Sequence, residues 1–277
     1  MKVNFIKASL FVLVTFFFLS SFSTKDKVEE FQGKAYYFSK STMDLGRWGA
    51  RLNEAQKKQI MANLKNRLEK TYVLTFNKSE SFFYEEEKLD AMSGATDSWG
   101  KNFTPGEQYK NVVENLQIQE QEFYGKQFLV KDKLQPISWT MGKESKQIGN
   151  YMCFKATATV PTNDLTWYNF SWDRLRTEAA ADSTGTPEVK MTEIEAWYTP
   201  QIPVSHGPSE YWGLPGLILE VSADNTTMLC SKIVLNPEEK IEIKAPKRGQ
   251  EITKEAYQKT ISERMKSFRD NRMRRRG

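Results

Sequence analysis

The stretch "EYWGLPGLILEV", residues 210–221, joins a stiff corner to an apolar run. Gly213 and Gly216 can adopt positive φ without steric cost, while Pro215 fixes its own φ and favours an extended Leu214. In the run 217–221 that follows, successive side chains point to opposite faces, which is typical of a β-strand. The stretch therefore predicts a sharp turn that leads directly into a buried strand.

The same period of two recurs along most of the chain. It is clearest in the segments 72–87, 109–134, 148–160, 190–199, 222–235 and 240–246. Turns are expected at 77–79, 124–126, 223–225 and near Gly142. The strands do not alternate with helices, so a parallel sheet is not indicated. We predict a mainly β (α+β) fold with one wide, curved antiparallel sheet of roughly eight to ten strands, a half-barrel or open barrel, because wide sheets tend to curl.

A helix is expected near each end of this sheet. The first follows Asn53, a predicted N-cap whose capping box is completed by Gln56. The second follows the N-cap Thr253. Apolar residues recur at helical spacing in both, as Ile60, Leu64 and Leu68 in the first and Tyr257, Ile261, Met265 and Phe268 in the second.

The first 23 residues have the pattern of a secretory signal peptide. Lys2 and Lys7 precede an apolar run over 8–19, and small residues at Ser21 and Ser23 precede the expected cut. We therefore expect a periplasmic or secreted protein, cleaved near Ser23. A single β-rich domain is expected over 24–270, followed by a basic disordered tail at 271–277.

The charge is distributed unevenly along the chain. Basic residues are concentrated in the segment 253–277, whereas the remainder of the exported chain is slightly acidic. A continuous basic face is not indicated, so no nucleic-acid partner is expected. The basic tail is interpreted as a solvated end, and contact with an anionic membrane surface is the alternative.

The chain has two cysteines, Cys153 and Cys230, both in strand-like surroundings. An oxidising compartment permits a disulfide between them, and two buried thiols are the alternative. The single histidine, His206, gives no metal-ligand spacing, so no metal site is assigned. Copper binding remains an alternative, since copper accepts thioether sulfur; the candidate methionines are Met141, Met152, Met191 and Met228.

A proline-rich segment precedes the opening stretch. Pro200, Pro203 and Pro208 cannot lie inside a ladder, so residues 200–212 are expected to form an extended, ordered loop. This loop either caps the open end of the sheet or lines a mouth for a ligand. The candidate ligand-binding residues are Trp197, Tyr198, His206, Tyr211 and Trp212.

These residues also carry a family resemblance. The chain resembles the GLPGLI family, whose hexapeptide stands here as Gly213, Leu214, Pro215, Gly216, Leu217 and Ile218. The likeness extends over 196–221, and weaker likeness covers 72–81, 128–158 and the closing helix. The resemblance implies an exported protein of the Gram-negative cell envelope without an assigned activity.

Catalytic chemistry has little support in this sequence. A serine triad would have to use His206 with Ser205 or Ser209 and Glu210, and no Gly-x-Ser-x-Gly elbow is present. We assign no catalytic residue and no cofactor. The favoured function is a non-enzymatic binding or accessory module with an apolar or peptide-like ligand. The alternative is a scaffold subunit that docks on an outer-membrane transport complex or another envelope protein complex.

Overall fold

The computed structural model describes residues 31–42, 51–86, 105–172, 175 and 189–274. All of them belong to one compact unit, Phe31–Gly277. The expected signal peptide at 1–23, its cut near Ser23 and the last three residues of the expected tail lie outside the described residues.

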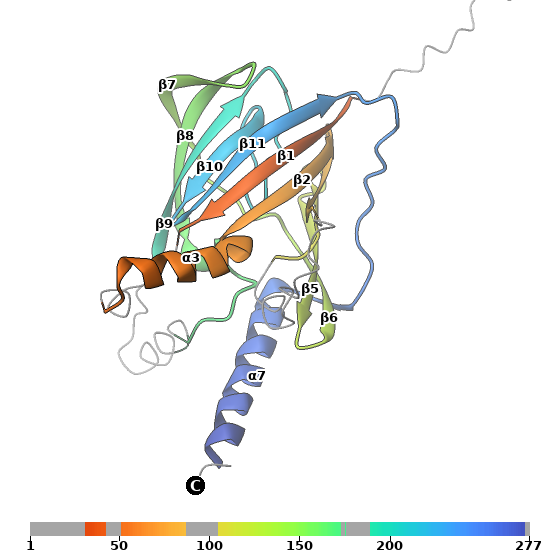
Figure 1. Ribbon diagram of the computed structural model, residues 1–277. Helices are drawn as coiled ribbons and strands as arrows, with labels where there is room; N and C mark the ends of the chain where they lie inside the picture. Colours follow the sequence, from red (N-terminus) through yellow and green to blue (C-terminus); the bar gives the residue numbers. More distant parts are fainter. Residues whose placement is uncertain (1–30, 43–50, 87–104, 173–174, 176–188, 275–277) are drawn as a thin grey trace, which may run out of the picture. The chain divides into compact units, whose positions relative to one another are not determined.

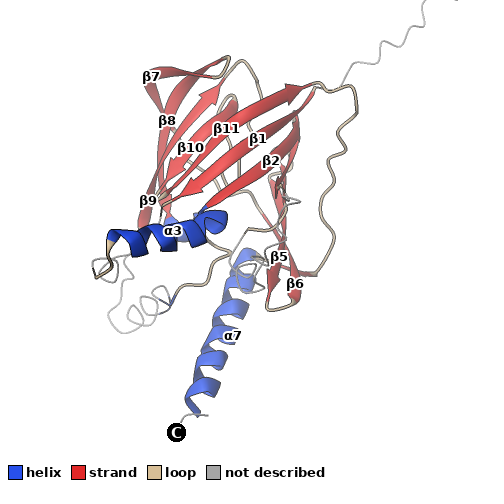
Figure 2. Ribbon diagram, in the orientation of Figure 1, coloured by secondary structure: helices blue, strands red, loops and turns tan. Residues whose placement is uncertain are grey.

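The described residues form one open sheet of twelve strands (Figures 1 and 2). The strands are β1 (Gln32–Ser41), β2 (Glu69–Asn77), β3 (Glu80–Glu85), β4 (Gln108–Asn111), β5 (Leu116–Phe123), β6 (Lys126–Asp132), β7 (Thr140–Ile148), β8 (Tyr151–Pro161), β9 (Met191–Thr199), β10 (Leu217–Ala223), β11 (Thr226–Leu235) and β12 (Gln250–Ile252). Their order across the sheet is β12-β6-β5-β4-β3-β2-β1-β11-β10-β9-β8-β7. The prediction of a mainly β fold with one wide sheet is confirmed. The sheet is wider than predicted and mixed, because β12 pairs with β6 in parallel.

Two polar turns define the strands at one end of the sheet. The side-chain oxygen of Asn77 accepts from the backbone N–H groups of Ser79 and Glu80, at 2.8 and 2.7 Å, and closes the β2–β3 hairpin. Asn111 accepts in the same way from Val113 and Glu114. This second Asx-type turn separates β4 from β5, so the segment 109–134 contains three strands where the sequence indicated two.

Two predictions of strand limits are wrong. The chain reverses at 149–150, where Gly149 has a φ of 57°, and not near Gly142. Gly142 instead lies in an irregular stretch of β7, where the pairing with β8 shifts between Met141 and Ser145. The segment 240–246 is not a strand, and the edge strand on this side is β12.

The helices are α3 (Glu54–Leu68), the short α5 (Thr162–Leu165) and α7 (Lys254–Arg274). The capping box of α3 is confirmed, since Asn53 and Gln56 exchange bonds of 2.8 and 3.0 Å. The hydroxyl of Thr253 accepts from Ala256 at the start of α7. Because α7 continues to Arg274, residues 271–274 are helical and not part of a disordered tail, in keeping with the high helix propensity of arginine. Among the described helices, none is long and apolar enough to span a membrane.

One face of the sheet is covered by other parts of the chain. On β1, Ala35 and Tyr37 point to this covered face and are fully buried, whereas Phe38 and Lys40 on the opposite face are exposed. The apolar cover comes from the segment between β9 and β10, from residues 162–172 and from α7. On α7, Tyr257 packs with Phe128 of β6 in an edge-to-face contact at 5.3 Å.

Candidate functional site

The loop of residues 200–216, here called the Pro-rich loop, lies on the covered face. Ile202 and Val204 pack in the same apolar cluster as Leu74 of β2 and Tyr37 of β1. The loop then runs back beside the start of β10, where the backbone N–H of Ile218 donates to the carbonyl of His206 at 3.1 Å. The loop therefore fills the covered face, which agrees with the interpretation that it caps the sheet.

The hexapeptide at 213–218 has a clear structural role. Gly213 has a φ of 92°, which disfavours any side chain. A Cβ atom on Gly216 would lie 2.2 Å from the carbonyl oxygen of Thr199, so only glycine lets β10 start this close to the end of β9. Three apolar members of the hexapeptide, Leu214, Leu217 and Ile218, are fully buried, and Pro215 is exposed.

A buried lysine anchors the Pro-rich loop to β4. The Nζ of Lys110 donates to the carbonyl oxygens of Gly207 at 2.9 Å and Ser209 at 2.6 Å. Lys110 is fully buried, and this burial lowers the pKa of its ammonium to about 7. Nearby Glu210 opposes that shift of the pKa, and the charge of Lys254 adds to it. These contacts join the loop to β4, although the residues in contact are at least 97 positions apart in the sequence.

The carboxylate of Glu210, which belongs to the Pro-rich loop itself, is a second buried charged group at this anchor. One of its oxygens, Oε1, accepts three hydrogen bonds, from Gln108 at 2.7 Å, Gln117 at 2.9 Å and the indole of Trp167 at 3.0 Å. The other oxygen lies 3.4 Å from the Nζ of Lys254 on α7. Glu210 thus connects the loop to four parts of the chain: β4, β5, α7 and the segment that follows α5.

His206 is fully buried beside this polar group. Its Nε2 lies 3.0 Å from the carbonyl oxygen of Asn77, while its Nδ1 has no hydrogen-bond partner in the described structure. Burial, followed by the charge of Lys110, lowers the pKa of His206 to about 3, so the imidazole is neutral. The bonds of Glu210 lead to Gln108, Gln117 and other donors and not to His206, so the arrangement is not that of a catalytic triad.

The methionines of the copper alternative are not gathered around His206. Met141, Met152 and Met191 are about half exposed, whereas His206 has no exposed surface. In the described residues, no group of three or more His, Cys, Asp or Glu side chains is placed to hold a metal ion.

The five predicted ligand-binding residues lie in separate environments. Trp197 and Tyr198 are almost fully buried, at 7% and 8% exposure, and the ammonium of Lys146 covers the Trp197 ring at 4.2 Å. Trp212 and Tyr211 are half-buried. The Trp212 indole donates to the carbonyl of Gln135, and its own carbonyl accepts from Trp139, at 2.7 and 2.8 Å. The parts of this set that ligands can reach are Tyr211 and Trp212.

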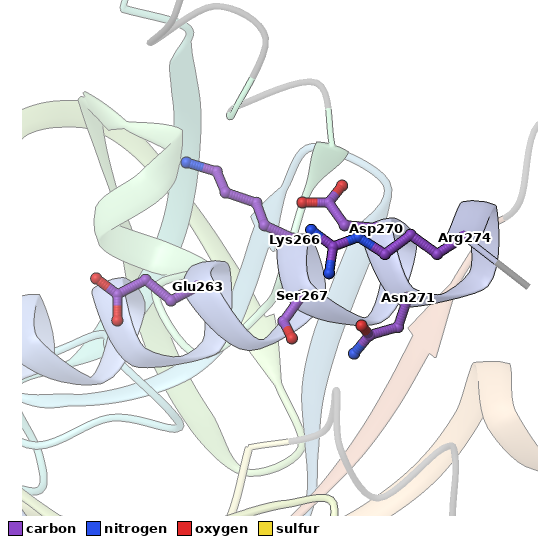
Figure 3. Close-up of a pocket in the computed structure, with 6 residues that line it drawn as sticks. All are labelled: Glu263, Lys266, Ser267, Asp270, Asn271 and Arg274. Atoms are coloured by element: carbon purple, nitrogen blue, oxygen red, sulfur yellow. The ribbon is translucent and has the colours of Figure 1, made fainter.

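Two hollows of the described surface lie elsewhere. One runs along α7 and is lined by Glu263, Lys266, Ser267, Asp270, Asn271 and Arg274, all from this helix (Figure 3). A second adjoins it and includes Leu175. Both hollows are open and lined by charged and polar side chains, so neither is an apolar cavity.

Exposed apolar side chains gather instead at the β7 edge of the sheet. Met141, Met152 and Phe154, here called the β7–β8 strip, are 51%, 47% and 38% exposed. The ring of Phe154 lies 6.3 Å from that of Tyr198, and the backbone N–H of Met152 donates to Gln201 at 2.8 Å. The strip therefore borders the start of the Pro-rich loop. The sequence gives no signal for this exposure, because periodicity does not show where the cover of a sheet ends.

The two cysteines are free and buried, so the expected disulfide is not formed. Cys153 is on β8 and Cys230 on β11, with β9 and β10 between these strands in the sheet. Each thiol instead lies within donor distance of a nearby backbone carbonyl, that of Tyr151 or Lys232. The structure therefore has two buried thiols, which was the alternative to a disulfide.

Comparisons with known proteins give a match between part of the chain and the model of one family, which has no assigned function. No curated protein matches the chain. Two solved crystal forms of PNGF-II, in space groups C2 and P21, align with TM-scores of 0.48 and 0.41 at 14% identity. The alignments cover 83% and 74% of this chain and 32% and 28% of those chains, so the chain spans about a third of their length or less. Residues 139–220, from β7 into β10 and including the whole Pro-rich loop, match the model of a family described as "Protein of unknown function (Porph_ging)".

Proposed function

We propose that the chain is an exported cell-envelope protein of the GLPGLI family and serves as a non-enzymatic accessory module. On this proposal it binds an extended, apolar segment of another envelope protein along β7. The hexapeptide at 213–218 and the pattern of residues 1–23 support the family and the export. The observation that carries the binding proposal is the exposed β7–β8 strip at an edge of the sheet.

The edge position of β7 supports a peptide-like ligand. Among the described strands, β7 is the last in the order and pairs only with β8, so its outer backbone groups have no strand partner within this part of the chain. Such an edge can be extended by a further strand from a partner. The irregular stretch between Met141 and Ser145 interrupts the pairing with β8, which is present at residues 140–141 and in a longer run at 145–148. Exposed methionines beside this run offer an adaptable apolar surface.

The filled interior favours this proposal over a carrier of apolar small molecules. The Pro-rich loop occupies the covered face through Ile202, Val204, Leu214 and its anchor at Lys110. The hollows described above are polar and lie along α7. On this proposal, a partner binds at the surface of the module.

Photo-crosslinking in the cell that makes the protein tests this proposal. A photoreactive phenylalanine replaces Met152 or Phe154, and in the controls it replaces Phe38 or Leu229. The control positions have similar exposure, 38% and 40%, but lie on β1 and β11. We expect one protein adduct of defined mass from the strip and none from the controls. Equal adducts from all four positions, or none from the strip, would contradict the proposal.

A further inference from the structure

The exposed half of α7 carries an aromatic patch that the binding proposal does not use. Phe268 of α7 contacts Tyr124, at the tip of the β5–β6 hairpin, with ring centres 5.0 Å apart. The guanidinium of Arg269 lies 5.4 Å from the ring centre of Trp172, which in turn meets Phe170 at 4.8 Å. We call these five residues the α7 patch.

The aromatic rings of the α7 patch are accessible. Phe268, Tyr124 and Trp172 are 41%, 37% and 36% exposed. By contrast, Ile261 and Tyr257, about two and three turns before Phe268 on the same helix, are fully buried against β6 and its neighbours. Figure 1 shows the C-terminal half of α7 running free of the strands. The apolar stripe of the helix thus continues past the part that the sheet covers.

Basic residues surround this patch. The segment 262–274 contains five basic and two acidic residues; the basic ones are Arg264, Lys266, Arg269, Arg272 and Arg274. Arg264 and Arg272 are four residues before and after Phe268, so they share its side of the helix. The two acidic residues, Glu263 and Asp270, line the hollow of Figure 3 together with the basic Lys266 and Arg274, and Asp270 also pairs with Arg269 of the patch at 3.1 Å. The side with the exposed rings is therefore the more positive one.

We infer that the α7 patch binds the surface of an anionic phospholipid membrane. Aromatic rings with one polar and one apolar side are favoured at the depth of lipid headgroups. Guanidinium groups bind phosphate oxygens with two parallel hydrogen bonds. An acidic protein would match the charge, but it would not need three exposed rings beside the arginines. The inference is independent of the β7–β8 strip and of any partner bound there.

Vesicle sedimentation tests the inference. The purified chain beginning at Thr24 retains every described residue and lacks the apolar run at 8–19, which could itself bind lipid. It is mixed with vesicles of phosphatidylcholine alone or of phosphatidylcholine with phosphatidylglycerol. We expect binding to the anionic vesicles only, weakened at high salt. Arg269→Gln with Arg272→Gln should weaken it about 25-fold, at about fivefold for each basic residue near the surface.

A matched variant separates the patch from general attraction between charges. Lys40→Gln with Lys232→Gln removes the same charge from exposed positions on β1 and β11, and should leave vesicle binding unchanged. Trp172→Ala should weaken binding at constant net charge. Equal losses in the two charge variants, equal binding to both kinds of vesicle, or no binding to either would overturn the inference. Crosslinking from Met152 would be unaffected in each case.

Discussion

The ammonium of Lys110 on β4 donates to the carbonyl oxygen of Ser209 across 2.6 Å, although the two residues are 99 positions apart in the chain. Lys110 has no exposed surface, so its ammonium has exchanged water for the carbonyls of the Pro-rich loop. A buried charge costs free energy unless hydrogen bonds replace its hydration. This hydrogen bond therefore holds the loop on the covered face. The loop in turn supplies the carbonyl groups that replace the hydration of the buried ammonium.

Replacing Lys110 should destabilise the fold. In Lys110→Met the carbonyls of Gly207 and Ser209 lose their buried donor, and Glu210 loses a nearby positive charge. We expect the free energy of unfolding to fall by about 3 kcal/mol, measured by urea denaturation. Lys131→Met is the control, since Lys131 forms an exposed ion pair with Glu251 at 3.6 Å and should change little. Equal stability of both variants would show that the anchor contributes nothing.

His206 should make the fold sensitive to mild acid. Its pKa in the folded chain is about 3, below the ordinary 6.5. Between these values the unfolded chain takes up a proton that the folded chain does not, so stability falls as the pH falls from 6.5 towards 3. At pH 5 the loss is about 2 kcal/mol, from about 1.4 kcal/mol per pH unit.

The test compares unfolding curves of the wild type and of His206→Gln from pH 7 to pH 4. The glutamine removes the titrating group and keeps a donor that can face the carbonyl of Asn77. The carboxylates titrate in both proteins, so the difference between the two curves isolates His206. Parallel curves over this range would contradict the prediction.

The local features of this fold were predictable from the sequence. The capping box of Asn53 and Gln56, the turn at Asn77 and the start of α7 after Thr253 each depend on residues a few positions apart. The corner at 213–216 was likewise predictable, because glycine and proline restrict or permit backbone angles by themselves.

The polar interior could not be predicted in this way. On β5, Gln117, Gln119 and Gln121 lie on the covered face and are almost fully buried. They are satisfied by partners distant in the chain, such as Lys254, which donates to Gln117 at 2.8 Å. The only signal in the sequence was three glutamines at a spacing of two, which also fits a solvated strand.

Gly216 should be irreplaceable for steric reasons. In Gly216→Ala the new Cβ atom would meet the carbonyl oxygen of Thr199 at 2.2 Å, and backbone cannot move aside as a flexible side chain can. We expect a loss of about 3 kcal/mol or more in the free energy of unfolding, or failure to fold. Thermal unfolding followed by circular dichroism measures this.

Gly149→Ala serves as the comparison. Gly149 has a positive φ, 57°, which Gly216 does not have, and no atom lies within 4 Å of its added Cβ. Gly149→Ala should lower the free energy of unfolding only by the cost of placing alanine at a positive φ, about 1 kcal/mol. If Gly216→Ala cost no more than Gly149→Ala, the close approach to Thr199 would not explain the glycine at 216.

The two cysteines should behave as unreactive thiols. Burial raises the pKa of Cys153 to about 11 and that of Cys230 to about 12, so few thiolates exist at neutral pH, and thiolates are the reactive form. We expect negligible alkylation by iodoacetamide in the native protein and alkylation of both cysteines once it is unfolded in denaturant without reductant. Mass spectrometry of the intact chain counts the adducts. Absence of adducts in the unfolded chain would show that Cys153 and Cys230, which lie in the same apolar cluster, are bonded after all.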